Sequence, residues 1–312
     1  MATTPCSMYA TASWRRGEMN ESAAAVGTFD GVHLGHAEVL ATVRREAEER
    51  GLTPLAITFD RHPLSLIAPE RAPMAITSIE RKEKLIKKNG ITPVVLPFDE
   101  KMRETSAADW MKLLHDKYGV RLLVVGYDNT FGCDGVNLSI ADYRKIGESL
   151  GMEVIEAPFV EGISSSAVRK RIAAGDIEST RSMLGRPFSL SGRVVEGNKL
   201  GRTIGFPTAN IQASPGIILP GKGVYAARAC LPDGKYVDAM VNIGVRPTIR
   251  RGNSPTVEAH LINWKGDLYG HVIRLEFYKR LRDEQQFNSI DALRRQLKKD
   301  LEETLLALPT RR

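Results

Sequence analysis

The chain has 312 residues, of which 42% are hydrophobic and 26% charged, and its formal net charge is +7. This composition is ordinary for a soluble globular protein, and the length predicts about two domains. The sequence contains no apolar run near the roughly 20 residues of a membrane helix, and its N-terminus lacks the apolar core of a secretory signal. We therefore expect a cytoplasmic protein with no membrane partner.

The cysteines and the charges indicate which covalent links and ligands to expect. Cys6, Cys133 and Cys230 lie far apart, so their spacing supports neither a zinc site nor a disulfide framework. Residues 186–312 hold 21 Lys and Arg against 12 Asp and Glu, a net of +9, whereas residues 1–185 hold 23 against 25, a net of −2. The basic excess suits an anionic ligand, although a solvated basic surface explains it without any partner.

The first half of the chain alternates short apolar stretches with amphipathic ones. Strands are expected near residues 23–26, 55–59, 93–96, 122–125 and 154–157, and helices near 35–50, 78–88, 107–117 and 140–150. Gly51 is placed to end the first helix. Strands that alternate with helices are typical of βαβ units, so we predict an α/β domain with a parallel sheet covered on both faces.

The pattern changes near Gly185, after which short β-rich stretches follow one another without long helices between them. Strands are expected near residues 190–195, 224–230, 236–243, 256–264 and 272–278, and a final helix near 289–306. Closely spaced strands with turn signals such as Pro232-Asp233-Gly234 are typical of a small antiparallel barrel. We therefore predict two domains, residues 1–185 and 186–312.

The strongest local signal in the first half is the run from Gly27 to His36, GTFDGVHLGH. Glycines at a strand-to-helix turn let the backbone approach a phosphate, and the dipole of the following helix favours an anion. His33 and His36 lie three residues apart, so both can donate hydrogen bonds to the same phosphates during group transfer. A half metal site and a purely structural turn remain open, and the run matches neither the P-loop nor the dinucleotide pattern.

A second anion-binding element is predicted at residues 162–169 (GISSSAVR), which open a helical stretch ending near Ala174. Three hydroxyls, the helix amides and Arg169 together would form a cradle for an anion. The serines could equally serve only as helix caps. Because both elements follow strands of a parallel sheet, we expect them at the edge where open sheets bind their ligands.

These two elements, with residues 58–63 (TFDRHP) and 125–132 (VGYDNTFG), resemble the nucleotidyltransferase superfamily and, more narrowly, the FMN adenylyltransferase module of bacterial bifunctional FAD synthetases. The resemblance implies a Rossmann-like nucleotidyltransferase sheet on which His33, His36 and Arg169 act on the ATP phosphates. The nucleotide-binding residues that it implies are Gly27, Phe29, Asp30, Gly31, Asp128, Ser164, Ser165 and Ser166. The loop 129–136 departs from the family, because Asn129, Thr130, Cys133, Gly135 and Val136 stand where basic residues are usual.

In the second half, Pro207-Thr208-Ala209-Asn210 follows a glycine-rich stretch that contains Gly201 and Gly205. Thr and Asn supply neutral oxygen atoms that can help to hold a magnesium ion otherwise bound by substrate phosphates and water. A turn in which both side chains bond only to nearby backbone explains the tetrapeptide equally well.

The whole second half resembles riboflavin kinase, through residues 223–225 (GVY), 241–248 (VNIGVRPT), 257–261 (VEAHL), 267–270 (DLYG) and 277–287 (FYKRLRDEQQF). The resemblance implies a six-stranded antiparallel barrel with a C-terminal helix. The roles that it implies are metal binding by Thr208 and Asn210, nucleotide binding by Gly201, Gly205 and Pro207, and a flavin contact by Arg282. It also implies that Glu258 is the base for the ribityl 5′-hydroxyl, within hydrogen-bond reach of that group.

Together the resemblances imply a bifunctional enzyme with ATP, riboflavin, FMN and FAD as substrates and products and Mg²⁺ as cofactor. Three alternatives remain: a riboflavin kinase with an inactive first domain, a nucleotidyltransferase for another substrate, and a flavin- or nucleic-acid-binding regulator. Only 6% of the residues are aromatic, so stacking platforms for nucleic acid are sparse and no nucleic-acid partner is expected. Self-association stays open.

Overall fold

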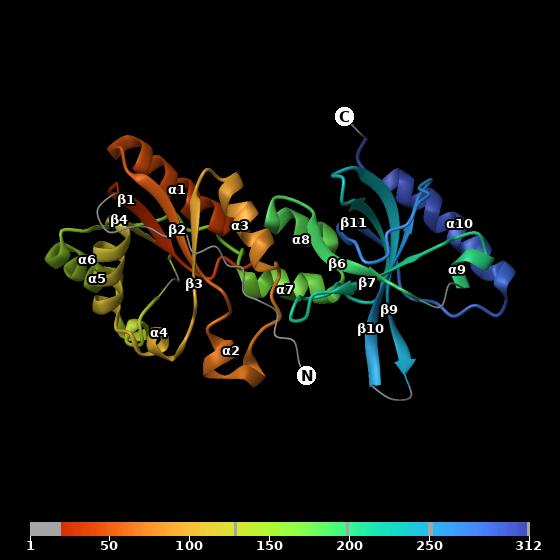
Figure 1. Ribbon diagram of the computed structural model, residues 1–312, viewed down its shortest axis with the longest axis horizontal. Helices are drawn as coiled ribbons and strands as arrows, with labels where there is room; N and C mark the ends of the chain where they lie inside the picture. Colours follow the sequence, from red (N-terminus) through yellow and green to blue (C-terminus); the bar gives the residue numbers. More distant parts are fainter. Residues whose placement is uncertain (1–19, 128–129, 198–199, 249–251, 311–312) are drawn as a thin grey trace. The chain divides into compact units, whose positions relative to one another are not determined.

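The computed structural model describes residues 20–127, 130–197, 200–248 and 252–310, and contacts divide the chain into two compact units. The first unit contains the chain up to Pro73 and Ile79–Glu161, and the second contains Met74–Ser78 and the chain from Gly162 onward. Each unit has its own sheet (Figure 1), and the buried apolar clusters that pack on the two sheets are separate.

The first unit is built on a parallel five-stranded sheet with the order β3-β2-β1-β4-β5 (Figure 1). Its strands are β1 (Ser22–Val26), β2 (Thr53–Phe59), β3 (Thr92–Leu96), β4 (Val120–Val125) and β5 (Glu153–Glu156). The chain adds strands on one side of β1 and then on the other, so the order reverses between β1 and β4. Open parallel sheets bind ligands at the carboxyl ends of the strands beside such a reversal.

Helices cover both faces of this sheet, because alternate residues of a strand point to opposite sides. On one face, α1 (Leu34–Arg50) and α3 (Ile79–Lys88) supply Leu40 and Ile86 to a core shared with Ala25 of β1. On the other face, α5 (Ala107–Tyr118) and α6 (Ile140–Leu150) supply Trp110 and Tyr143 to a separate core. The connections contain the short helices α2 (Leu64–Ile67), η1 (Pro69–Arg71), α4 (Glu100–Glu104) and η2 (Gly135–Asn137).

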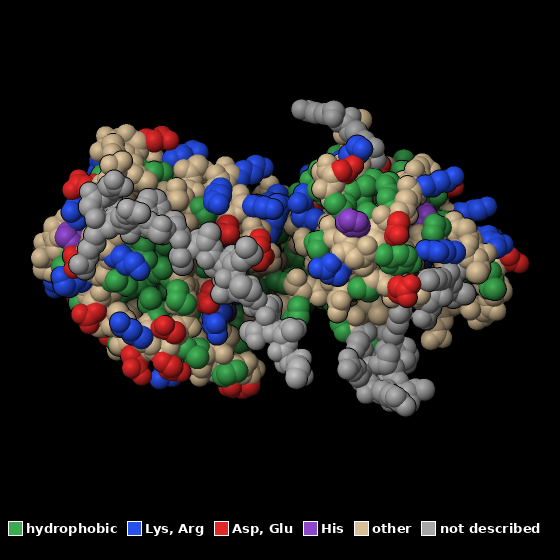
Figure 2. Space-filling model, viewed as in Figure 1, with side chains coloured by type: hydrophobic (Ala, Val, Ile, Leu, Met, Phe, Trp, Pro, Cys, Tyr) green, Lys and Arg blue, Asp and Glu red, His purple; other side chains and the backbone are tan. Residues whose placement is uncertain are grey.

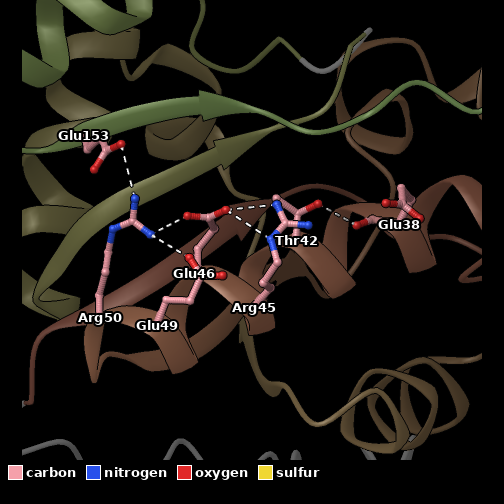
Figure 3. Close-up of polar contacts among 7 residues, drawn as sticks. All are labelled: Glu38, Thr42, Arg45, Glu46, Glu49, Arg50 and Glu153. Atoms are coloured by element: carbon pink, nitrogen blue, oxygen red, sulfur yellow. Dashed lines mark hydrogen bonds and ion pairs between the residues drawn. The ribbon is translucent and has the colours of Figure 1, made fainter.

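The long helix α1 ends at Gly51, as predicted, with a left-handed φ of 67°. Near this end, Glu46 pairs with Arg45 and Arg50, and Arg50 reaches Glu153 on β5 at 3.5 Å (Figure 3). The hydrogen bond from Arg45 lowers the pKa of Glu46. Exposed pairs of this kind add little stability, but they join the C-terminal end of α1 to the edge strand of the sheet.

The second unit is a closed six-stranded barrel with the order β10-β7-β6-β11-β8-β9, in which every neighbouring pair is antiparallel. Its strands are β6 (Phe188–Val195), β7 (Ala209–Ala213), β8 (Gly223–Cys230), β9 (Tyr236–Thr248), β10 (Gly252–Leu261) and β11 (Val272–Arg282). The fold class predicted from the sequence, a parallel α/β sheet followed by a six-stranded barrel and a C-terminal helix, is confirmed.

Helices of the second unit pack on two parts of the barrel. One pair, α7 (Ser165–Ala174) and α8 (Ile177–Leu184), adds Val168 and Leu184 to the main core of the barrel. On another part of the barrel, Leu297 and Leu301 of the long α10 (Ile290–Ala307) pack against a small cluster around Met240, and the short α9 (Leu200–Thr203) lies between β6 and β7 in the chain. Because α7 and α8 belong to the barrel unit, the compact units divide between Glu161 and Gly162, ahead of the predicted boundary at Gly185.

The basic side chains are dispersed rather than gathered into one patch on the face drawn in Figure 2, where Lys and Arg alternate with acidic and uncharged side chains. None of the helices in the described part of the chain is long and apolar enough to cross a membrane.

Candidate active sites

The turn between β1 and α1 contains backbone conformations that L-amino acids rarely adopt. Phe29, Gly31 and Val32 have φ angles of 45°, 80° and 40°, all in the left-handed region. Gly31 has no Cβ to clash there, but a non-glycine residue held in this region costs of order 1–3 kcal/mol. Such strain concentrates at functional sites. The turn lies at the carboxyl end of β1, beside the reversal of strand order.

His33 and His36 lie against each other at the start of α1. Their rings stack with centroids 3.7 Å apart, and the ring of Phe29 meets His36 edge-on at 5.3 Å. His33 is the N-cap of the helix, and its Nδ1 atom accepts a hydrogen bond from the backbone N–H of His36 at 3.3 Å. A neutral imidazole that accepts at Nδ1 carries its proton on Nε2. His33 can therefore donate through Nε2 at a helix end that favours anions.

Lys82 on α3, which the sequence analysis did not single out, contacts this turn from inside the protein. The side chain is only 7% exposed, and its Nζ atom donates to the Thr28 carbonyl at 3.0 Å and the Phe59 carbonyl at 2.9 Å. It also donates to the Thr58 hydroxyl at 2.9 Å. Burial lowers the pKa of Lys82 to about 8, and the nearby Asp30 carboxylate opposes that shift.

The loop after β4, where the sequence departs from the family, packs against α5 and α6. The Tyr143 hydroxyl donates to the Phe131 carbonyl at 2.9 Å and accepts from the Phe131 N–H at 3.0 Å. Gly132 has a φ of 89°, and a Cβ there would lie 2.4 Å from the backbone nitrogen of Ala107. Asp128 lies outside the described residues, so its nucleotide contact stays a prediction.

The serine-rich element begins α7 in the second unit. Ser164 is the N-cap, and its side chain accepts from the backbone N–H three residues later at 3.2 Å. Ser165 and Ser166 occupy the first turn, and Arg169 donates through Nε to a backbone carbonyl of the Met74–Ser78 segment at 2.9 Å. A cap and an anion cradle are compatible, because a helix start has several free amides. The element and the histidine pair belong to different units, so their action on one ATP stays a prediction.

The barrel unit has a cavity of about 580 Å³, a volume suited to a nucleotide-sized ligand. Pro207 and Thr208, both predicted to lie at a nucleotide site, line it. Three of the other lining residues stand out: Arg202 donates to the Tyr269 hydroxyl at 3.1 Å, and Trp264 contributes an aromatic surface. Tyr269 belongs to the segment 267–270 that carries the resemblance, but no role was predicted for it or for the other two, which come together only when the barrel closes.

Two glycines shape the chain before this cavity. A Cβ at Gly201 would lie 2.2 Å from the Phe206 carbonyl oxygen, and Gly205 has a left-handed φ of 85°. The turn delivers Pro207, whose carbonyl oxygen lies 2.8 Å from Nδ1 of His260 on β10. The backbone therefore requires glycine at both predicted positions, whether or not a phosphate binds there.

Glu258 lies between two asparagines on neighbouring strands. It pairs with Asn210 of β7 on one side and with Asn242 of β9 on the other. Residues paired in this way point to the same side of the sheet, with Cβ atoms about 4.5–5.5 Å apart. Val257 and Ala259 are buried in the core, so the half-buried Glu258 points to the outer face of the barrel.

The oxygen atoms near Glu258 fit a magnesium ion bound mainly through phosphates. Asn210 lies on β7 directly opposite Glu258, and Thr208 immediately precedes that strand, which begins at Ala209. Within the described residues, no group of three or more His, Cys, Asp and Glu could hold a metal by itself. An ion here would need further oxygen ligands from substrate and water, as is usual for Mg²⁺.

Arg282, expected to contact the flavin, holds the barrel to α10. Its guanidinium binds both carboxylate oxygens of Asp300, from Nε at 2.9 Å and from Nη2 at 2.7 Å, and Asp300 is only 1% exposed. The guanidinium also lies over the Phe287 ring at 5.7 Å. The ion pair is a structural role that the sequence did not predict, and the flavin contact stays a prediction.

Both halves of the chain match models of known families. A model described as FAD synthetase matches residues 16–169, and one described as riboflavin kinase matches residues 184–308. The parallel sheet with its histidine turn and the barrel with its cavity thus define a two-domain flavin-nucleotide transferase. The chain belongs to the bifunctional riboflavin kinase/FMN adenylyltransferase family.

Individual relatives are similar over most of their length. The bifunctional riboflavin kinase/FMN adenylyltransferase of Bacillus subtilis is 35% identical, covering 92% of this chain and 93% of the relative. That of Escherichia coli K12 is 37% identical, covering 88% and 89%. A solved structure from Streptococcus pneumoniae, described as a macrolide-efflux protein, is 29% identical with a TM-score of 0.83, covering 91% of this chain and 94% of that one.

Proposed function

We propose that the chain converts riboflavin to FAD in two ATP-dependent steps. The barrel phosphorylates riboflavin to FMN with release of ADP, and the parallel-sheet domain adenylylates FMN with release of pyrophosphate. The observation that carries the proposal is the presence of both family domains, in the same order as in relatives that match about nine-tenths of the chain. The functional domains proposed are residues 1–185 and 186–312.

In the kinase step, Glu258 accepts the proton of the ribityl 5′-hydroxyl as that oxygen attacks the γ-phosphorus of ATP. Its place beside Asn210, on the strand that follows Pro207 and Thr208, supports this role. The cavity lined by Thr208 and Trp264 is the proposed ATP site. An ion held in part by Thr208 and Asn210, which we expect to be Mg²⁺, would neutralise phosphate charge when bound.

In the adenylyl transfer, a phosphate oxygen of FMN attacks the α-phosphorus of a second ATP. The protein has little covalent chemistry to do here, so positioning and charge stabilisation carry the catalysis. His33 donates from Nε2, His36 stacks against it, and the start of α1 favours the negative charge. Arg169 and the serines of α7 are proposed to bind the same ATP.

The remaining expectations follow from this activity. ATP, riboflavin, FMN and FAD are the proposed small-molecule partners, with no nucleic acid and no membrane, and the proposed location is the cytoplasm. Self-association remains to be measured in solution.

The test is to incubate the purified chain with riboflavin, ATP and Mg²⁺ and to separate the flavins by chromatography. FMN followed by FAD is the expected result. FMN alone would support a riboflavin kinase whose first domain is inactive. If neither riboflavin nor added FMN reacted, the proposed function would be wrong.

A further inference from the structure

A buried lysine lies directly behind the proposed adenylyltransferase turn and has no part in the chemistry described so far. Lys82 is enclosed by three elements: its own helix α3, the end of β2, and the beginning of the β1–α1 turn. Lysine is almost never fully buried unless it is paired. The Lys82 side chain is 7% exposed, so a charge on it must be stabilised by specific partners.

The hydrogen bonds of Lys82 require its ammonium form. Two of its partners, the carbonyls of Thr28 and Phe59, can only accept. The third, the Thr58 hydroxyl, gives its own proton to the Thr28 carbonyl at 3.1 Å, so it too accepts from Lys82. Three acceptors need three N–H donors, which only the ammonium has. A neutral amine would lose one of these hydrogen bonds.

The ammonium of Lys82 on α3 links two segments that are distant in the sequence, the entry to the β1–α1 turn and the end of β2. Thr28 immediately precedes the stretch in which Phe29, Gly31 and Val32 are held in the left-handed region. Phe59 ends β2, the neighbour of β1 in the sheet. A strained turn persists only where its surroundings fix it. Lys82 supplies one such contact, through its hydrogen bond to Thr28 at the entry to the turn.

A gain in folding stability does not explain why Lys82 is charged. Burial lowers the pKa of Lys82 to about 8, although the carboxylates of Asp30, Asp60 and Glu83 raise it. Those three are the charged groups that act on it, from the turn, from the end of β2 and from α3 itself. A lowered lysine pKa means that folding disfavours the ammonium relative to the amine. The protein therefore carries this charge at a cost in stability.

We propose that Lys82 is a positioning residue for adenylyl transfer: its ammonium holds the β1–α1 turn in the conformation that presents His33 and the start of α1 to the ATP phosphates. Loss of the ammonium proton then releases one anchor of the turn and lowers the rate of FAD formation. The inference rests on the proposed function, because it concerns the adenylyltransferase half of that activity.

The test compares Lys82→Met with Lys84→Met, a matched control that removes an exposed lysine from the same helix. Both activities are measured on each preparation: riboflavin to FMN, and added FMN to FAD. We expect Lys82→Met to lose about 100-fold in kcat/KM for FAD formation, the size of effect that a small misplacement causes. Its riboflavin kinase activity should stay within twofold of the wild type, and Lys84→Met should keep both activities.

The pH profile separates positioning from simple packing. In the wild type, kcat/KM for FAD formation relative to riboflavin phosphorylation should fall above pH about 8, where the pKa of Lys82 lies. In Lys82→Arg, whose guanidinium stays protonated, that fall should move to higher pH. This measurement needs no folded methionine variant, so it decides the question even if Lys82→Met fails to fold.

Two results with the methionine variant and one pH comparison would overturn the inference. The first is FAD formation by folded Lys82→Met within threefold of the wild type. The second is an equal loss of both activities in that variant. The third is a wild-type profile with no selective fall in FAD formation up to pH 10, or the same fall in Lys82→Arg. A wild type that forms no FAD at all would instead reject the proposed function.

Discussion

Replacing Asp300 by alanine is expected to destabilise the barrel unit strongly. Asp300 is 1% exposed, accepts two hydrogen bonds from Arg282 at 2.9 and 2.7 Å, and accepts a third from Gln296 at 2.8 Å. Alanine would leave the mostly buried Arg282 without its counter-charge, and breaking a buried pair from one side costs about 3–5 kcal/mol. For a unit of this size, that free energy corresponds to a fall in Tm of roughly 10 °C.

The assay is urea unfolding of the full chain, followed by circular dichroism, with Glu302→Ala as control. Glu302 is an exposed carboxylate on the same helix, α10, so its removal should change the free energy of unfolding by under about 0.5 kcal/mol. If Asp300→Ala unfolded within about 1 kcal/mol of the wild type, the argument from a buried, uncompensated charge would be refuted.

A double variant separates the structural role of Arg282 from its predicted flavin contact. In Arg282→Met with Asp300→Leu, both charges leave together, so most of the stability lost in Asp300→Ala should return. Riboflavin KM can then be measured on a well-folded protein. A rise in KM of tenfold or more would support the flavin contact, and an unchanged KM would leave Arg282 as the anchor of α10 alone.

The remaining predictions concern three other positions. Glu258→Gln should lower kcat for riboflavin phosphorylation by about 10²–10⁴-fold, since an amide cannot take the proton, while FAD formation from added FMN persists; equal losses in the two rate assays would contradict the assignment. Gly132→Ala should destabilise more than Gly51→Ala, because a Cβ at Gly132 meets backbone at 2.4 Å and one at Gly51 meets nothing within 4 Å; equal shifts in urea midpoint would argue against it. The pKa of Lys82 is lowered from 10.5 to about 8, so between those pH values the folded chain binds fewer protons than the unfolded chain, and stability rises with pH. Lys82→Met should lack this gain of about 3 kcal/mol, and a wild-type-minus-variant difference that stays flat with pH would count against the lowered pKa.

Much of the fold could be predicted because it depends on local sequence patterns. The alternation of apolar and amphipathic stretches predicted all five strands of the parallel sheet, and Gly51 ends its helix as expected. The strand β7 was not located from the pattern, because its five residues, ANIQA, contain a single buried apolar side chain, Ile211, and so show neither an apolar run nor a clear alternation. The helix α8 was missed although it buries Ile177 and Leu184 on one side, because its eight residues are too few to establish a helical period.

The site was less predictable because its partners are distant in the sequence. The residues near the β1–α1 turn were identified from their motif, but the ammonium behind it comes from Lys82, more than fifty positions later. The only local sign was its place beside Leu85 and Ile86 on the buried side of α3. The pairing of Arg282 with Asp300 likewise depends on how α10 packs, which no local pattern encodes.

The segment Met74–Ser78 affects how the protein folds during synthesis and how its gene can be divided into fragments. It lies within the sequence of the first unit, yet Ala75 bridges to Ile217, and Ile76 is fully buried in the core of the barrel unit. During synthesis this segment leaves the ribosome long before Ile217 and the rest of the barrel core, so Ile76 stays unburied until most of the chain has been made. A gene fragment that starts at Gly162 would also lack Ile76 and leave a hole in that core. A single cut after Glu161 therefore keeps the first unit whole but separates Met74–Ser78 from the rest of the second.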